Sequence, residues 1–178
     1  MKKLKTFQRI ILFFVVISGT LWLGSYFTRL VISYQIFHGT DFTLRDYVND
    51  QNIEGILLSF KPAIISTMIL YTIFILTFFS FIITSKLSLK ENGWLFIITI
   101  IIVITLPFEF YLLTIDYKML SMMSIADFNK KEVLGMVIKR FQVFSSFPVI
   151  EIFCYAAVVF FVLFQPLTVK KELSENEN

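Results

Sequence analysis

The stretch WLFIITIIIVITL, residues 94–106, decides the fold of this chain, because it holds no charged residue and then runs into Pro107 and Glu109. A helix rises about 1.5 Å per residue, so Glu109 lies about 22 Å beyond Trp94. The apolar core of a bilayer is about 30 Å thick, and a helix through this stretch would therefore carry Glu109 inside a membrane. An ionisable group at that depth is costly, which makes Glu109 the first candidate for a functional residue.

Three more apolar blocks accompany this one. The chain has 178 residues, of which 57% are hydrophobic and 22 are phenylalanine, and charged residues bound each block. A membrane-spanning helix needs about 20 apolar residues, and one soluble core would hardly account for four such blocks. We predict an all-α integral membrane protein with an antiparallel bundle of four transmembrane helices, over residues 10–36, 63–84, 94–115 and 148–165. Residues 1–166 would form one domain, and residues 167–178 a charged, disordered tail.

The segment between the third and fourth spans has a different pattern. Over residues 129–144, Val133, Val137 and Phe141 fall on one arc of a helix, while Lys131 and Lys139 fall away from it. Arg140 lies inside the apolar arc, so the amphipathic pattern is imperfect. We interpret this segment as a short amphipathic helix that lies in the membrane interface or forms a surface for a partner.

Charged residues on three different spans are expected at similar depth: Arg29, Glu109 and Glu151. Each would be costly to bury alone, so we predict that they form one polar cluster. Thr105, Glu109 and Asp116 share a face of the third span at helical spacing. Glu109 could pair with Arg29 or carry a proton, and two acids beside one arginine would leave one carboxyl group protonated.

Small residues recur in the first span at Thr20, Gly24 and Thr28, four residues apart. Such a ridge lets another helix approach closely. We predict that it packs against a helix of the same chain or of a second copy.

The composition argues against several classes of protein. A single histidine, His38, and a single cysteine, Cys154, exclude a haem held by two histidines and a disulfide within the chain. No GxSxG, HExxH, P-loop or GxGxxG motif is present, and we expect no catalytic, cofactor-binding or metal-binding residues. The net charge of +3 is spread over the chain, which argues against a nucleic-acid partner.

The basic residues suggest an orientation. Lys2, Lys3, Lys5 and Arg9 precede the first apolar block, and the loop after that block is rich in acids. By the positive-inside rule both place the N-terminus in the cytoplasm, and four spans would bring the C-terminus back there. Against this, the third loop carries five basic residues: Lys118, Lys130, Lys131, Lys139 and Arg140. The first block is too long for a secretory signal, so we expect it to remain as a membrane helix. The Ile-, Phe- and Lys-rich composition favours a bacterial cytoplasmic (inner) membrane.

Three functions remain open. The first is a non-catalytic accessory or assembly subunit, or an interaction scaffold, with a membrane-protein partner or a second copy of the chain. The second is a small transporter, or a subunit of one, that uses Glu109 as an intramembrane proton or cation site. The third is a membrane enzyme or quinone-associated redox subunit, whose cofactors a partner would have to supply. The first accounts for the polar residues most simply.

Overall fold

The fold is known from a computed structural model that describes residues 5–39, 41–144 and 147–168. The described residues form five helices, α1 (Thr6–Gln35), α2 (Ile53–Ser85), α3 (Gly93–Met122), α4 (Lys130–Gln142) and α5 (Phe147–Phe164). A short antiparallel hairpin, β1 (Phe37–His38) and β2 (Thr43–Leu44), follows α1. As predicted, four helices are long and apolar enough to cross a membrane: α1, α2, α3 and α5.

Two of these helices extend well beyond the predicted spans. α2 begins at Ile53 rather than at residue 63, so that Pro62 lies inside the helix. α3 continues to Met122 rather than ending at residue 115. Hydropathy marks only the apolar part of a helix, whereas the helix itself continues through polar residues that face outward, such as Ser59 and Lys118.

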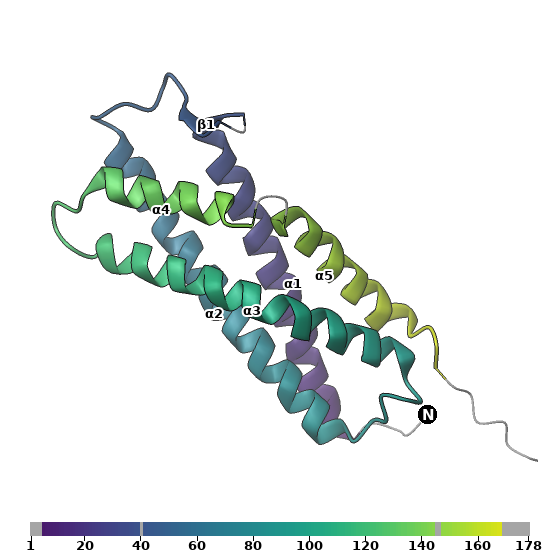
Figure 1. The fold of residues 1–178 in the computed structure, drawn as a ribbon. Helices are drawn as coiled ribbons and strands as arrows, with labels where there is room; N and C mark the ends of the chain where they lie inside the picture. The colour runs from purple at the N-terminus through teal and green to yellow at the C-terminus, as the bar shows by residue number, and fades with distance from the viewer. Residues whose placement is uncertain (1–4, 40, 145–146, 169–178) are drawn as a thin grey trace, which may run out of the picture.

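α4 and α5 together run antiparallel to α3 (Figure 1). α4 lies along the C-terminal half of α3, and α5 lies along its N-terminal half, while α1 and α2 form a long antiparallel pair beside them. The bonded pairs that join α3 to the chain after it are, in order along α3, Gly93 with Leu167, Thr105 with Tyr155 and Asp116 with Arg140. As the residue numbers rise along α3, those of the bonded partners fall, so α3 runs antiparallel to both α5 and α4.

The interior contains two apolar clusters with polar residues between them. The first cluster joins α1, α2, α3 and α5 and is largely aromatic, with Trp22, Phe74, Phe78, Phe81 and Trp94 among its members. The second lies under α4 and the hairpin, with Phe37, Leu57, Phe60, Met119 and Val133 among its members. Between the clusters along α3 lie Thr105, Glu109 and Asp116, all buried. We call this region the polar layer.

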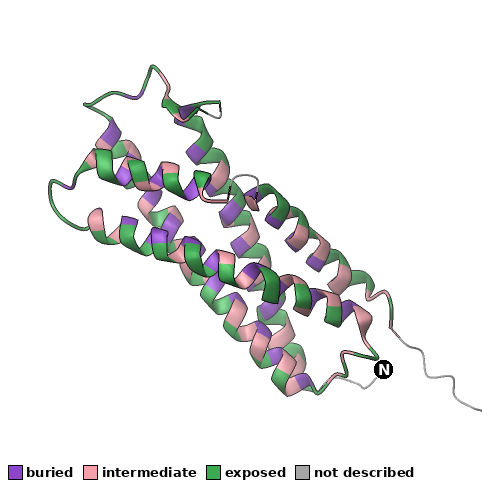
Figure 2. Cartoon of the chain, viewed as in Figure 1, coloured by how far each residue is buried: buried purple, intermediate pink, exposed green. Residues whose placement is uncertain are grey.

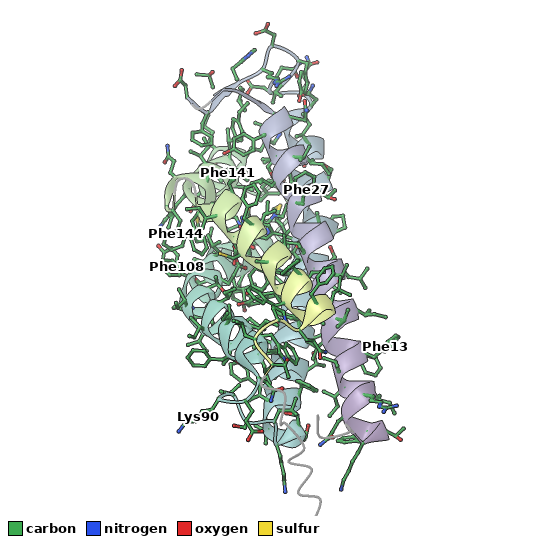
Figure 3. All side chains as sticks on the ribbon, turned by 90° about the vertical axis from the view of Figure 1, so that its right-hand side faces the viewer. Phe13, Phe27, Lys90, Phe108, Phe141 and Phe144 are labelled. Carbon is green, nitrogen blue, oxygen red and sulfur yellow. The ribbon has the colours of Figure 1, made fainter. Side chains whose placement is uncertain are left out.

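The outer surface of the four long helices is apolar, whereas the polar layer is inside. Large apolar side chains are exposed on every one of them, for example Phe13 (58% exposed), Leu76 (64%), Phe110 (65%) and Phe153 (71%). Figure 2 shows exposed residues along the full length of these helices, and Figure 3 shows Phe13 and Phe27 projecting outward from α1. A soluble domain rarely exposes so extensive an apolar surface.

The amphipathic helix is present as α4, but its apolar arc packs inside the chain. The Asn129 side chain caps it by accepting hydrogen bonds from the backbone N–H groups of Lys131 and Glu132. Val133, Val137 and Phe141 are buried in the second apolar cluster. The interpretation of this arc as a free surface for a partner is therefore wrong, because α2 and α3 already cover it.

The predicted tail starts later than residue 167. The Leu167 carbonyl accepts a hydrogen bond of 3.1 Å from the Gly93 N–H. Thr168 forms an isolated bridge with Asn92, so these two residues belong to the folded chain. The rest of the predicted tail, residues 169–178, lies outside the described residues.

Candidate functional site

The polar layer contains an ionic group built from three helices. Arg29 of α1 donates from both terminal nitrogens to Asp116 of α3, at 2.6 and 2.5 Å. Arg140 of α4 donates from Nε to the same carboxylate at 3.0 Å. All three side chains are buried. The fork-to-fork geometry of the Arg29–Asp116 pair gives strong, directional bonds, and removing one partner would leave an uncompensated buried charge.

Arg140 reaches this group from α4. Its guanidinium lies 5.6 Å from the centre of the Tyr26 ring, a distance typical of a cation–π contact. Burial by itself lowers the pKa of Arg140, but the surrounding acidic groups, Asp116 foremost, together raise the pKa above the ordinary value of arginine. Arg140 is therefore charged, and it fixes α4 to the interior of the bundle. Arg140, which interrupts the apolar arc of the predicted amphipathic helix, is thus an ion-pair partner in the interior.

Glu109 of α3 and Glu151 of α5 form the second part of the polar layer. Glu109 is 1% exposed and Glu151 is 0% exposed. The Oε1 atom of Glu109 and both carboxyl oxygens of Glu151 have no hydrogen-bond partner among the described residues. Because α3 and α5 are antiparallel and Thr105 bonds Tyr155, the two side chains, one turn further along from that bond, lie opposite each other. Since a carboxylate can only accept, this contact becomes a hydrogen bond only when one of the two groups carries a proton.

Aromatic hydroxyl groups surround the carboxyl pair. Tyr155 shares a hydrogen bond of 2.8 Å with Thr105, one turn before Glu109. The hydroxyls of Tyr26 and Tyr71 are buried without a geometrically well-formed bond to another described residue. The Trp22 ring packs against all three tyrosines, with ring centroids between 4.6 and 5.5 Å apart. Among the described residues, none of these hydroxyls forms a hydrogen bond to either carboxyl group.

The structure brings together only part of the predicted cluster. Glu109 and Glu151 are neighbours, as the shared depth suggested, but Arg29 pairs with Asp116 rather than with Glu109. Glu151 lies beyond the first turn of α5, so the positive end of the helix dipole does not account for a carboxyl group at this position. Sequence reasoning missed Asp116 and Arg140 as partners. The sequence contained an indication of each: Asp116 shares a helix face with Glu109, and Arg140 interrupts the apolar arc of residues 129–144.

No helix among the described residues covers the small-residue ridge of Thr20, Gly24 and Thr28. All three residues are exposed, and a Cβ built at Gly24 meets no atom within 4 Å. Of the two predicted partners, a helix of the same chain does not lie against Gly24, and packing on a second copy stays a prediction. Gly19 lies against a helix of the same chain instead, because a Cβ there would lie 2.9 Å from the ring of Phe74 on α2.

An apolar groove lies beside this ridge, between α1 and α5. It has a volume of about 60 Å³, and Phe74 of α2 contributes to its lining. Gly19 and Thr20 line it from α1, and Tyr155 and Val159 line it from α5. The groove is thus an opening in the wall of the bundle at the level of the first apolar cluster.

Within the described part of the chain, no group of three or more His, Cys, Asp or Glu side chains is arranged to hold a metal ion. Cys154 is a free, half-buried thiol on α5. What the site can do chemically is hold charge and protons inside an apolar bundle. No protein family model, no curated protein and no solved structure matches this chain.

Proposed function

We propose that this chain is an integral membrane protein that works without catalysis, as a subunit or scaffold of a membrane assembly. The apolar outer surface of α1, α2, α3 and α5 supports insertion, because lipid would solvate side chains that water would not. The inward position of the buried charges supports it as well, since intramembrane charges almost always face the interior of a bundle.

The proposed membrane is the cytoplasmic (inner) membrane of a bacterium, with both termini in the cytoplasm. Cysteine labelling of intact cells on a Cys154→Ser background tests this orientation. We expect single cysteines at Asp50 and Asn129 to react with an impermeant reagent from outside, and one at Ser88 to be protected. Strong labelling at Ser88 from outside would reverse the topology.

The observation that carries the subunit proposal is the outward-facing ridge of Thr20, Gly24 and Thr28. In lipid no hydrophobic force drives helices together, so association depends on close backbone approach at small residues. The adjoining groove between α1 and α5 adds a depression that a partner helix could fill. The partner would be a membrane protein or a second copy of the chain.

Gly24→Leu tests this proposal, with Gly55→Leu as the matched control at another exposed helical glycine. Both variants have open space at the Cβ, so the isolated chain should melt at the wild-type temperature. We expect Gly24→Leu to lose the stoichiometric partner or second copy that the wild type retains in mild detergent, and Gly55→Leu to keep it. An assembly that survives Gly24→Leu would rule out the ridge as its contact.

A transporter that uses Glu109 as a proton or cation site is the second candidate. The observation in its favour is that Glu109 is buried while Arg29 is engaged elsewhere, so that no arginine neutralises Glu109 through a direct hydrogen bond among the described residues. The test is complementation of a deletion strain by Glu109→Gln and Glu109→Leu. Neither variant can exchange a proton at this position, so transport should be lost in both. Full complementation by Glu109→Gln would exclude this candidate.

A further inference from the structure

We propose that Glu109 of α3 and Glu151 of α5 form a binding site for one proton, which the two carboxyl groups share. The site goes beyond the function proposed above. This proton site depends only on the fold of the chain, and not on a partner protein or on a transport activity.

Glu109 lies one turn after Thr105 and Glu151 one turn before Tyr155, so the Thr105–Tyr155 bond between the antiparallel helices places the two carboxyl groups opposite each other. Three of their four oxygens are buried without a hydrogen-bond partner among the described residues. As two carboxylates they would face each other as acceptors with like charge, in a site sealed from water. With one proton between them, one group donates to the other, and the repulsion and the missing donor are both resolved.

The charge of the whole polar layer also requires one proton on the pair. Arg29 and Arg140 supply two positive charges, and Asp116 bonds both of them while supplying one negative charge. One further negative charge makes the layer neutral, and a Glu109–Glu151 pair with a single proton supplies it. No proton on the pair would leave the layer with a net negative charge, and two protons would leave it with a net positive one. A buried group is stable only when its charges are compensated.

The surroundings of the pair contain no further cation that would change this balance among the described residues. The titratable and charged groups near it come from every packed helix: Tyr26 and Arg29 from α1, Tyr71 from α2, Asp116 from α3, Arg140 from α4 and Tyr155 from α5. The tyrosines are neutral donors. Both arginines are already bonded to Asp116.

Infrared spectroscopy of the purified chain in lipid nanodiscs tests the site. We expect the wild type to show the C=O stretching band of a buried carboxylic acid at neutral pH, displaced in D₂O. Glu109→Gln and Glu151→Gln should each lose this band. In each variant the amide can donate to the remaining carboxylate, and the layer is neutral without a proton. Glu132→Gln, at an exposed position on α4, is the control and should keep the band.

A second measurement uses the wild type alone and does not depend on whether a variant folds. Unfolding the chain at neutral pH exposes both glutamates, whose ordinary pKa is about 4.3, so about one proton per chain should be released to an indicator dye. No acid band and no released proton would overturn the proposal. A band that persists in one of the two glutamine variants would also overturn it, because the proton would then belong to a single residue. Failure to find a partner protein would leave both measurements unchanged.

Discussion

Asp116 is the residue on which the ionic part of the polar layer depends, and Asp116→Asn should lower the free energy of unfolding by about 3–5 kcal/mol. The wild-type carboxylate accepts bonds of 2.6 and 2.5 Å from Arg29 and one of 3.0 Å from Arg140. Hydrogen bonds to charged groups contribute about 1.5–3 kcal/mol each, so three independent bonds would exceed this loss. The loss is smaller because asparagine keeps one accepting oxygen, and because the carboxyl pair of Glu109 and Glu151 can release its proton to restore neutrality.

Reversible unfolding in mixed detergent micelles measures this effect. Asp127→Asn, at an exposed position on the loop before α4, is the matched control and should be near neutral. Arg140→Met should cost less than Asp116→Asn, about 1.5–3 kcal/mol, because it removes one bond and leaves the Arg29–Asp116 fork intact. A loss of less than about 1 kcal/mol for Asp116→Asn would show that this buried, bonded carboxylate contributes no more than a surface ion pair, and Asp116 would then not hold the ionic group together.

Three further substitutions, with Gly24→Ala as a control, test the packing around the polar layer by the same measurement. Gly19→Ala should lower stability by about 1–3 kcal/mol, because its Cβ would meet the buried Phe74 ring at 2.9 Å, whereas Gly24→Ala should be neutral or slightly stabilising. Phe141→Ala should cost about 3–5 kcal/mol and make α4 accessible to limited proteolysis, because Phe141 anchors α4 in the second apolar cluster. Tyr155→Phe should cost about 1 kcal/mol, because it removes the 2.8 Å hydrogen bond across α3 and α5.

The four long helices could be predicted from the sequence because apolar residues occur there in uninterrupted blocks. Their ends could not, because a helix continues through polar residues as long as its backbone bonds are satisfied. Pro62 illustrates the difference, because the apolar block begins directly after it and yet the residue lies inside α2. α4 was predictable from its arc of Val133, Val137 and Phe141 and from the capping residue Asn129.

The polar layer could be predicted only in outline. Burial of Glu109 and Glu151 follows from their place in apolar blocks, and their proximity follows from a common depth. The partner of Arg29 does not follow, since depth alone cannot choose between Glu109 and Asp116, which lie two turns apart on one face of α3. The choice depends on α4, because Arg140 reaches the same carboxylate and makes Asp116 the centre of the group.

In a membrane, the polar layer would also fix the register of the helices. Apolar helix surfaces in lipid can slide past one another at little cost, because lipid solvates them as well as a neighbouring helix does. The layer removes that freedom, since a shift of α3 by one turn, about 5.4 Å, would carry Asp116 away from Arg29 and Arg140 together. The same shift would separate Glu109 from Glu151. α1, α3, α4 and α5 are thus held at one relative height by two contacts of different chemistry, and because α3 takes part in both, a shift of α3 breaks them together.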